Sequence, residues 1–273
     1  MNQPKSIEAM VARAQAGDRD ALAEVVRAMQ DRVFHLALRM LGTAEDARDA
    51  SQEILVRMVT KLGSFRGESS FGTWVHRLAV HALINTKIAL RRRESNFDDL
   101  GESLDAAVAA SAGMTLAPEH AALIDEAKQV CVQGMLLCLD RPHRVAYILG
   151  EILELAGDEA AAILEITPAA YRKRLSRARA EMDAFFAGRC GLADPANACR
   201  CRRVLPLAIA GGIVDPAAPP FARLPVVRED RLRVDIERLR SGAEIVRGLP
   251  QHGSPEDFAQ GIRTLLRGFD DAN

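Results

Sequence analysis

The sequence has few aromatic residues, nearly equal numbers of positive and negative side chains, and an odd number of cysteines. Aromatics make up 4% of the 273 residues, too few for a binding surface built from stacked rings. Lys and Arg number 36 and Asp and Glu number 37, so any surface that binds a polyanion must be local. The five cysteines, two mid-chain and three late, do not suit a secreted disulfide framework.

Membrane-directing segments are also absent from the pattern. The first ten residues contain no apolar signal-peptide core, and the longest hydrophobic run, Val204–Val214, reaches only about half of a bilayer span. We therefore expect a soluble, cytoplasmic protein with no membrane insertion. Hydrophobic residues still make up 48% of the chain, which is enough for a packed core.

Helical periodicity dominates the residues that follow the N-terminus. Around residues 46–62, one apolar stripe recurs at helical spacing and consists of Ile54, Leu55, Met58, Val59 and Leu62. No segment shows convincing strand alternation, and residues 119–186 also show helical patterning. The predicted fold class is therefore all-α.

Shifts in composition divide the chain into four regions. Between Glu94 and Pro118 there are five acids and no Lys or Arg, which predicts an acidic linker. Eight of the twelve prolines lie at or beyond Pro195, within an extension that we expect to contain helices at about 227–247 and 255–268. The expected organisation is a helical domain (6–93), the linker (94–118), a second helical domain (119–186) and a C-terminal helical extension (187–273).

A helix-turn-helix is predicted between Leu155 and Met182. Thr167 can cap the second helix and Pro168 suits its first turn. Tyr171, Leu175, Ala178 and Met182 form a buried stripe, whereas the other side carries Arg172, Lys173, Ser176, Arg177 and Arg179. Such a helix suits a DNA groove, with N-terminal residues near base edges and later cations on phosphates. The alternative is a solvated amphipathic helix.

Two stretches resemble a known family. Residues 49–57 read DASQEILVR, and residues 65–79 read FRGESSFGTWVHRLA. With the helix-turn-helix, they resemble bacterial RNA polymerase sigma factors of the small extracytoplasmic-function (ECF) type over about residues 6–186. The resemblance implies a promoter-specificity subunit that is not an enzyme. Its partners would be core RNA polymerase and promoter DNA, with an anti-sigma factor left open as a third.

The same resemblance implies roles for matching positions. The polymerase-binding residues would be Asp49, Gln52, Glu53 and Arg57. The −10 element would be contacted by Arg66, Trp74, Arg77, His81, Lys87, Arg91, Arg92 and Arg93, although Trp74 alone reads more simply as a core residue. The −35 element would be contacted by Thr167, Ala169, Ala170, Arg172, Lys173, Ser176 and Arg177.

Three cysteines cluster at the start of the extension. Cys190, Cys199 and Cys201 could share Zn²⁺ or another soft metal, with Cys131, Cys138 or His252 as a fourth ligand. Alternatively, Cys199 and Cys201 could be redox-sensing thiols whose pKa is lowered by Arg200, Arg202 and Arg203. A third possibility is three reduced cysteines in a tight turn with no metal. No cofactor is required by the pattern.

Two questions stay open at this point: what the extension does, and whether the chain binds DNA with or without polymerase. The extension could cover a functional face and regulate the protein. The competing interpretation of the whole chain is a helix-turn-helix regulator that binds DNA without polymerase and senses a metal or oxidant through these cysteines. No nucleophile triad, Gly-rich phosphate loop or carboxylate pair supports an enzyme.

Overall fold

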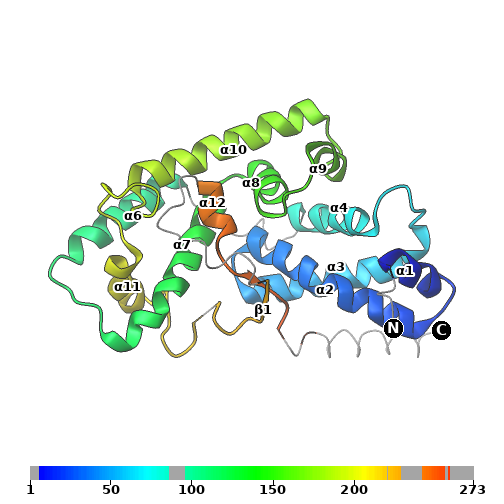
Figure 1. The fold of residues 1–273 in the computed structure, drawn as a ribbon, viewed down its shortest axis with the longest axis horizontal. Helices are drawn as coiled ribbons and strands as arrows, with labels where there is room; N and C mark the ends of the chain where they lie inside the picture. Colours follow the sequence, from blue (N-terminus) through cyan, green and yellow to red (C-terminus); the bar gives the residue numbers. More distant parts are fainter. Residues whose placement is uncertain (1–5, 86–95, 220, 229–241, 256–257, 259–273) are drawn as a thin grey trace. The chain divides into compact units, whose positions relative to one another are not determined.

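The computed structural model describes residues 6–85, 96–219, 221–228, 242–255 and 258 (Figure 1). These residues are helical apart from turns and two short paired strands, which confirms the all-α fold class. The chain divides into two compact units. The first contains residues 1–91, 163–165 and 252–273, and the second contains residues 92–162 and 166–251.

The first unit consists of capped helices joined by short turns. They are α1 (Ile7–Gln15), α2 (Arg19–Leu41), α3 (Ala44–Thr60), the 3-10 turn η1 (Leu62–Ser64) and α4 (Phe71–Ile84). The side chain of the residue before each α-helix accepts a backbone N–H of its first turn, which satisfies a donor that the helix itself cannot. Gly42 ends α2 at a φ of 90°, a left-handed conformation that glycine adopts without steric cost.

The core of this unit lies where α2 packs against α3 and α4. Every residue of α2 from Val33 to Leu41 is buried. The stripe predicted on α3 is confirmed for Ile54, Leu55, Met58 and Leu62, all of which are buried, whereas Val59 is half-buried. Ser254 and Phe258 also belong to this unit: Ser254 donates from its backbone and its hydroxyl to Asp31 at 2.9 and 2.7 Å, and the Phe258 ring contacts Phe34.

The remaining elements lie in the second unit, apart from Ile163 at the end of α9 and His252 in β2, which belong to the first. They are α6 (Phe97–Ala110), η2 (Pro118–Leu123), α7 (Ile124–Cys138), α8 (Arg141–Tyr147), the π-turn η3 (Ile148–Ile152), α9 (Gly157–Ile163), α10 (Pro168–Arg189), α11 (Cys201–Ala210), β1 (Val226–Arg228), α12 (Gly242–Arg247) and β2 (Gln251–His252). Pro142 and Pro168 occupy first turns, as predicted. The long helix α10 packs against α8 and α12 (Figure 1).

The prediction of an acidic linker over residues 94–118 is wrong for most of its length. Residues 97–110 form α6, which packs within the second unit against α7, α10 and α11. The Phe97 ring lies 5.2 Å from that of Phe185, and Arg189 pairs with Asp105 at 2.6 Å. Phe97, Leu100 and Leu104 share one face at helical spacing, and the composition of the segment hid this weak apolar stripe.

The predicted boundary at residue 187 is also not a structural boundary. Helix α11, from the extension, packs on α6 and α7, and its Leu205 joins Ala127 and Val214 in one buried cluster. Helix α12 packs on α10 and η3. The extension therefore completes the core of the second unit, because helices 119–186 alone leave apolar faces uncovered.

Helix predictions within the extension meet mixed outcomes. The helix expected at 227–247 begins instead with strand β1 and ends as α12, and residues 229–241 between them lie outside the described residues. The helix expected at 255–268 also falls outside the described residues, apart from Pro255 and Phe258. Among the described helices, none has the length and apolar character needed to cross a membrane.

Candidate polymerase and nucleic-acid interfaces

The helix-turn-helix forms as its sequence predicts. The Thr167 hydroxyl accepts the Ala170 N–H at 3.2 Å and caps α10. Tyr171, Leu175, Ala178 and Met182 are buried, as expected of the predicted stripe. Glu165, in the turn between α9 and α10, has a φ of 54°, a left-handed conformation that favours glycine.

The opposite side of α10 presents side chains to solvent. Arg172, Lys173, Ser176 and Arg177 are exposed, together with Ala169 at the first turn, while Ala170 is half-buried. Thr167 is exposed, but its hydroxyl already caps the helix. The described part of the extension meets α10 further along, where Gly242 donates to Asp183 at 3.0 Å. Among the described residues, the cationic N-terminal half of α10 is therefore exposed.

Arg179 differs from the other cations of this helix. Its guanidinium pairs with Glu151 of η3, whose side chain is only 5% exposed. Arg247 of α12 pairs with the other oxygen of the same carboxylate at 3.2 Å. Arg179 therefore has a structural role, because it neutralises a buried carboxylate that α12 also contacts.

The predicted polymerase-binding residues form one line along α3. Asp49, Glu53 and Arg57 follow each other at four-residue spacing and are exposed, and Gln52 beside them is half-buried. Glu53 and Arg57 form an ion pair. The apolar stripe on the other side of the helix is buried in the core, so the charged line lies on the exposed side of α3.

The predicted −10 residues lie on and before α4, as far as they are described. Arg66 is exposed in the loop, His81 is exposed, and Arg77 is half-buried. Trp74 is half-buried, with its ring 5.6 Å from Phe65 and 5.5 Å from Phe71, so packing accounts for much of its surface. Lys87, Arg91, Arg92 and Arg93 lie outside the described residues.

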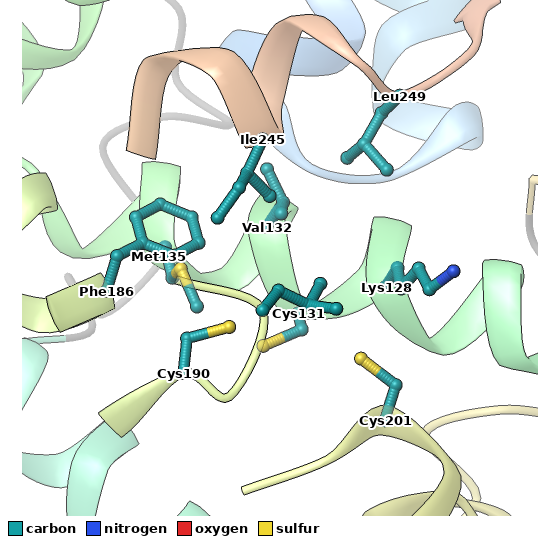
Figure 2. Close-up of a pocket in the computed structure, with 10 residues that line it drawn as sticks. Lys128, Cys131, Val132, Met135, Phe186, Cys190, Cys201, Ile245 and Leu249 are labelled. Atoms are coloured by element: carbon teal, nitrogen blue, oxygen red, sulfur yellow. The ribbon is translucent and has the colours of Figure 1, made fainter. Parts of the chain in front are cut away.

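The late cysteines come together with one from mid-chain. Cys190, directly after α10, and Cys201, the first residue of α11, lie close to Cys131 of α7 (Figure 2). Cys199, two residues before α11, lines the same cavity. The sequence offered Cys131, Cys138 and His252 as alternative fourth ligands, and of these three only Cys131 lines the cavity with the late cysteines. Across the described ranges, no three Cys, His, Asp or Glu side chains already stand in a metal-holding arrangement.

Comparisons with known proteins address the family. A family model described as Sigma-70 region 2 matches residues 25–96. The chain is 31% identical over 186 residues to the ECF RNA polymerase sigma-E factor of Escherichia coli strain K12, covering 67% of this chain and 95% of that protein. It is 30% identical over 175 residues to the RNA polymerase sigma-H factor of Pseudomonas aeruginosa, covering 64% and 90%. The chain belongs to the ECF sigma factor family.

One more curated relative agrees with this assignment. The ECF sigma factor SigW of Bacillus subtilis is 29% identical over 182 residues, which cover 63% of this chain and 92% of SigW. The solved structure of CnrH in complex with the cytosolic domain of CnrY aligns at a TM-score of 0.48 and 22% identity, covering 66% of this chain and 96% of that one. About a third of this sigma factor thus has no counterpart in these relatives.

The family assignment decides between the two interpretations of the whole chain. This sigma factor is a promoter-specificity subunit of RNA polymerase, and the interpretation as a polymerase-independent regulator is not supported. As a specificity subunit it is not expected to be an enzyme.

Proposed function

We propose that this sigma factor binds core RNA polymerase through the charged line on α3 and promoter DNA through α4 and the N-terminal half of α10. The observation that carries the proposal is the two-sided character of α10. On one side, every residue of the apolar stripe from Tyr171 to Met182 is buried. On the other side, Arg172, Lys173 and Arg177 are exposed over two turns. A rigid helix that offers cations at fixed spacing suits the phosphates and base edges of a major groove.

The DNA-binding role is tested by the salt dependence of promoter binding. Holoenzyme is assembled from core polymerase and the full chain, and a promoter is first identified by in-vitro transcription of genomic fragments. Arg177→Ala should lower the slope of log affinity against log salt by about 1, because one phosphate contact is lost. Arg27→Ala is the matched control, since it removes an exposed cation from α2. Equal slopes for the two variants would contradict the proposal.

The polymerase-binding role is tested by charge reversal on α3. Glu53→Lys should weaken the association with core polymerase at least about tenfold, which corresponds to about 1.4 kcal/mol. Glu102→Lys reverses an exposed carboxylate in the middle of α6, outside the proposed interface, and serves as the control. Affinity is measured by a fluorescence-anisotropy titration of labelled sigma factor. If Glu53→Lys binds like the control, α3 is not the interface.

We propose further that the extension regulates promoter use. Simple deletion of residues 188–273 is not a clean test, because it would remove Leu205, Val214, Phe221, Ile245 and other core residues of the second unit. Substitutions that loosen single docked segments are better suited. An anti-sigma partner stays a prediction, as do the −10 and −35 assignments of individual residues.

A further inference from the structure

Three separate elements of the second unit bring four thiols to one cavity. Cys131 lies on α7, Cys190 directly follows α10, Cys199 precedes α11, and Cys201 is its first residue. All four line the same cavity. Figure 2 shows Cys131 and Cys190 with their sulfur atoms turned toward each other, and the sulfur of Cys201 directed into the same space.

The loop that carries two of these thiols is closed by its own hydrogen bonds. Gly191 N–H donates to the Cys199 carbonyl at 3.0 Å, and the Asn197 amide donates to the carbonyls of Ala187 and Cys190 at 2.9 and 3.2 Å. A Cβ atom at Gly191 would lie 2.5 Å from the Cys199 carbonyl oxygen, so this close approach requires glycine. The ends of the loop are therefore held together before any ligand arrives, which lowers the entropy cost of collecting ligands.

The surroundings of the thiols are apolar. Met135, Phe185, Leu192 and Val204 line the cavity with them. Burial raises the pKa of Cys131 and Cys199, and that of Cys201 to about 12, and each of the three is raised further by neighbouring cysteines. Four thiolates would repel one another here, and a bound divalent cation removes that repulsion.

Cations placed beside the cluster could offset the remaining charge. Four thiolates and Zn²⁺ carry a net charge of −2. Lys128 lines a neighbouring pocket that shares Cys131, Cys190 and Cys201, and its charge offsets part of the rise in the pKa of Cys201. Arg200 likewise offsets part of the rise in the pKa of Cys199. Cys138 is not part of this cluster: it lies on the same helix as Cys131 but does not line the cavity, and burial raises its pKa to about 11.

We propose that Cys131, Cys190, Cys199 and Cys201 form a four-thiolate Zn²⁺ site that ties the start of the C-terminal extension to helix α7. Closing the site requires the thiols to rotate toward the cavity centre. Four Cys–S–H groups each lose a proton and form four Zn–S bonds, so four protons are released and no electron is transferred. The site would fix the backbone that leaves the DNA-binding helix α10.

The test uses the full chain, reduced and stripped of metal under argon. Zn²⁺ is titrated in competition with a colorimetric chelator, and Co²⁺ substitution reports the number of thiolates through the sulfur-to-cobalt charge-transfer band. We expect one Zn²⁺ per chain, tighter binding as pH rises, and at least about a tenfold loss of affinity in Cys131→Ser and in Cys199→Ser. Cys138→Ser is the matched control and should bind like the unmodified chain.

Three results would overturn the proposal. The first is no stoichiometric Zn²⁺ uptake by the reduced chain. The second is unchanged affinity and an unchanged Co²⁺ band in both Cys131→Ser and Cys199→Ser. The third is a disulfide within the cluster in protein prepared without oxygen. Because Cys131→Ser alters a half-buried side chain, the tyrosine spectrum of this variant is compared with that of the unmodified chain. If Cys131→Ser is misfolded, Cys199→Ser decides the outcome.

Discussion

Substituting Gly242 by alanine should loosen the packing of the extension on helix α10. Gly242 begins α12 and donates its N–H to Asp183 of α10 at 3.0 Å. A Cβ at this position would lie 2.4 Å from Cδ2 and 2.9 Å from Cε2 of the Phe186 ring. Phe186 is 1% exposed, so the ring cannot turn away without disturbing the core.

The magnitude follows from overpacking. Extra carbon in a filled core costs about 1–3 kcal/mol, because neighbouring side chains must leave their preferred rotamers. Displacement of α12 would also lengthen the hydrogen bond to Asp183 and the contact of Arg247 with Glu151. We therefore expect Gly242→Ala to lower the free energy of unfolding of the second unit by about 1–3 kcal/mol.

The aromatic residues provide separate probes for the two units. The single tryptophan, Trp74, lies in the first unit, and both tyrosines, Tyr147 and Tyr171, are buried in the second. In urea unfolding followed by tyrosine fluorescence, Gly242→Ala should lower the midpoint of the transition and leave its slope unchanged. The midpoint followed by Trp74 fluorescence should shift less. Gly188→Ala is the control, because a Cβ there meets nothing within 4 Å and alanine favours helix.

The comparison between the two alanine variants tests whether α12 packs on α10. If Gly242→Ala and Gly188→Ala move the tyrosine midpoint alike, α12 does not pack on α10 as described, and the extension does not complete this core. If Gly242→Ala also raises transcription from an identified promoter, the docked extension inhibits the sigma factor.

Further predictions concern single side chains. Glu126 accepts the N–H groups of Phe221 and Ala222 at 2.6 and 3.0 Å, so Glu126→Gln should lower the tyrosine-monitored stability by about 1.5–3 kcal/mol, while the exposed Glu119→Gln should not. Glu165→Gly should keep or raise stability in urea unfolding, whereas Glu165→Val should lower it by about 1–2 kcal/mol, because a β-branched residue disfavours positive φ.

The metal-free cluster gives a pH prediction. Burial raises the pKa of Cys201 to about 12, so its thiol keeps its proton when folded and loses it near pH ~8.5 when unfolded. The contribution of this thiol to stability is therefore complete below about pH 8.5 and is lost as the pH rises toward 12. Thermal unfolding across this range checks the sign, and alkylation of Cys201 at pH 8 that is as fast as that of free cysteine would contradict it.

Local physical rules explain the features that the sequence predicted correctly. The helix-turn-helix was readable because Thr167, Pro168 and the stripe from Tyr171 to Met182 act through neighbours within one or two turns. The choice of Asp49, Gln52, Glu53 and Arg57 came from the family resemblance, and the structure places Asp49, Glu53 and Arg57 on the exposed side of α3. Family resemblance added the functional roles of these faces.

Features that depend on distant contacts were not readable. Segment 94–118 was interpreted as a linker from its charge. In the structure, Phe97 contacts Phe185 and Asp105 pairs with Arg189, each more than eighty residues away along the chain. Arg179 looked like a DNA-binding cation until the buried Glu151 was placed beside it.

The sequence by itself determined that residues 6–85 and 119–186 are largely helical, which sides of α3 and α10 are apolar, and to which family the motifs belong, because these depend on periodicity and neighbouring residues. Only the tertiary structure decided that the extension belongs to the core of the second unit and that Cys131 joins Cys190, Cys199 and Cys201. Packing brings together residues whose separation along the chain carries no periodic signal, so their proximity cannot be read from spacing.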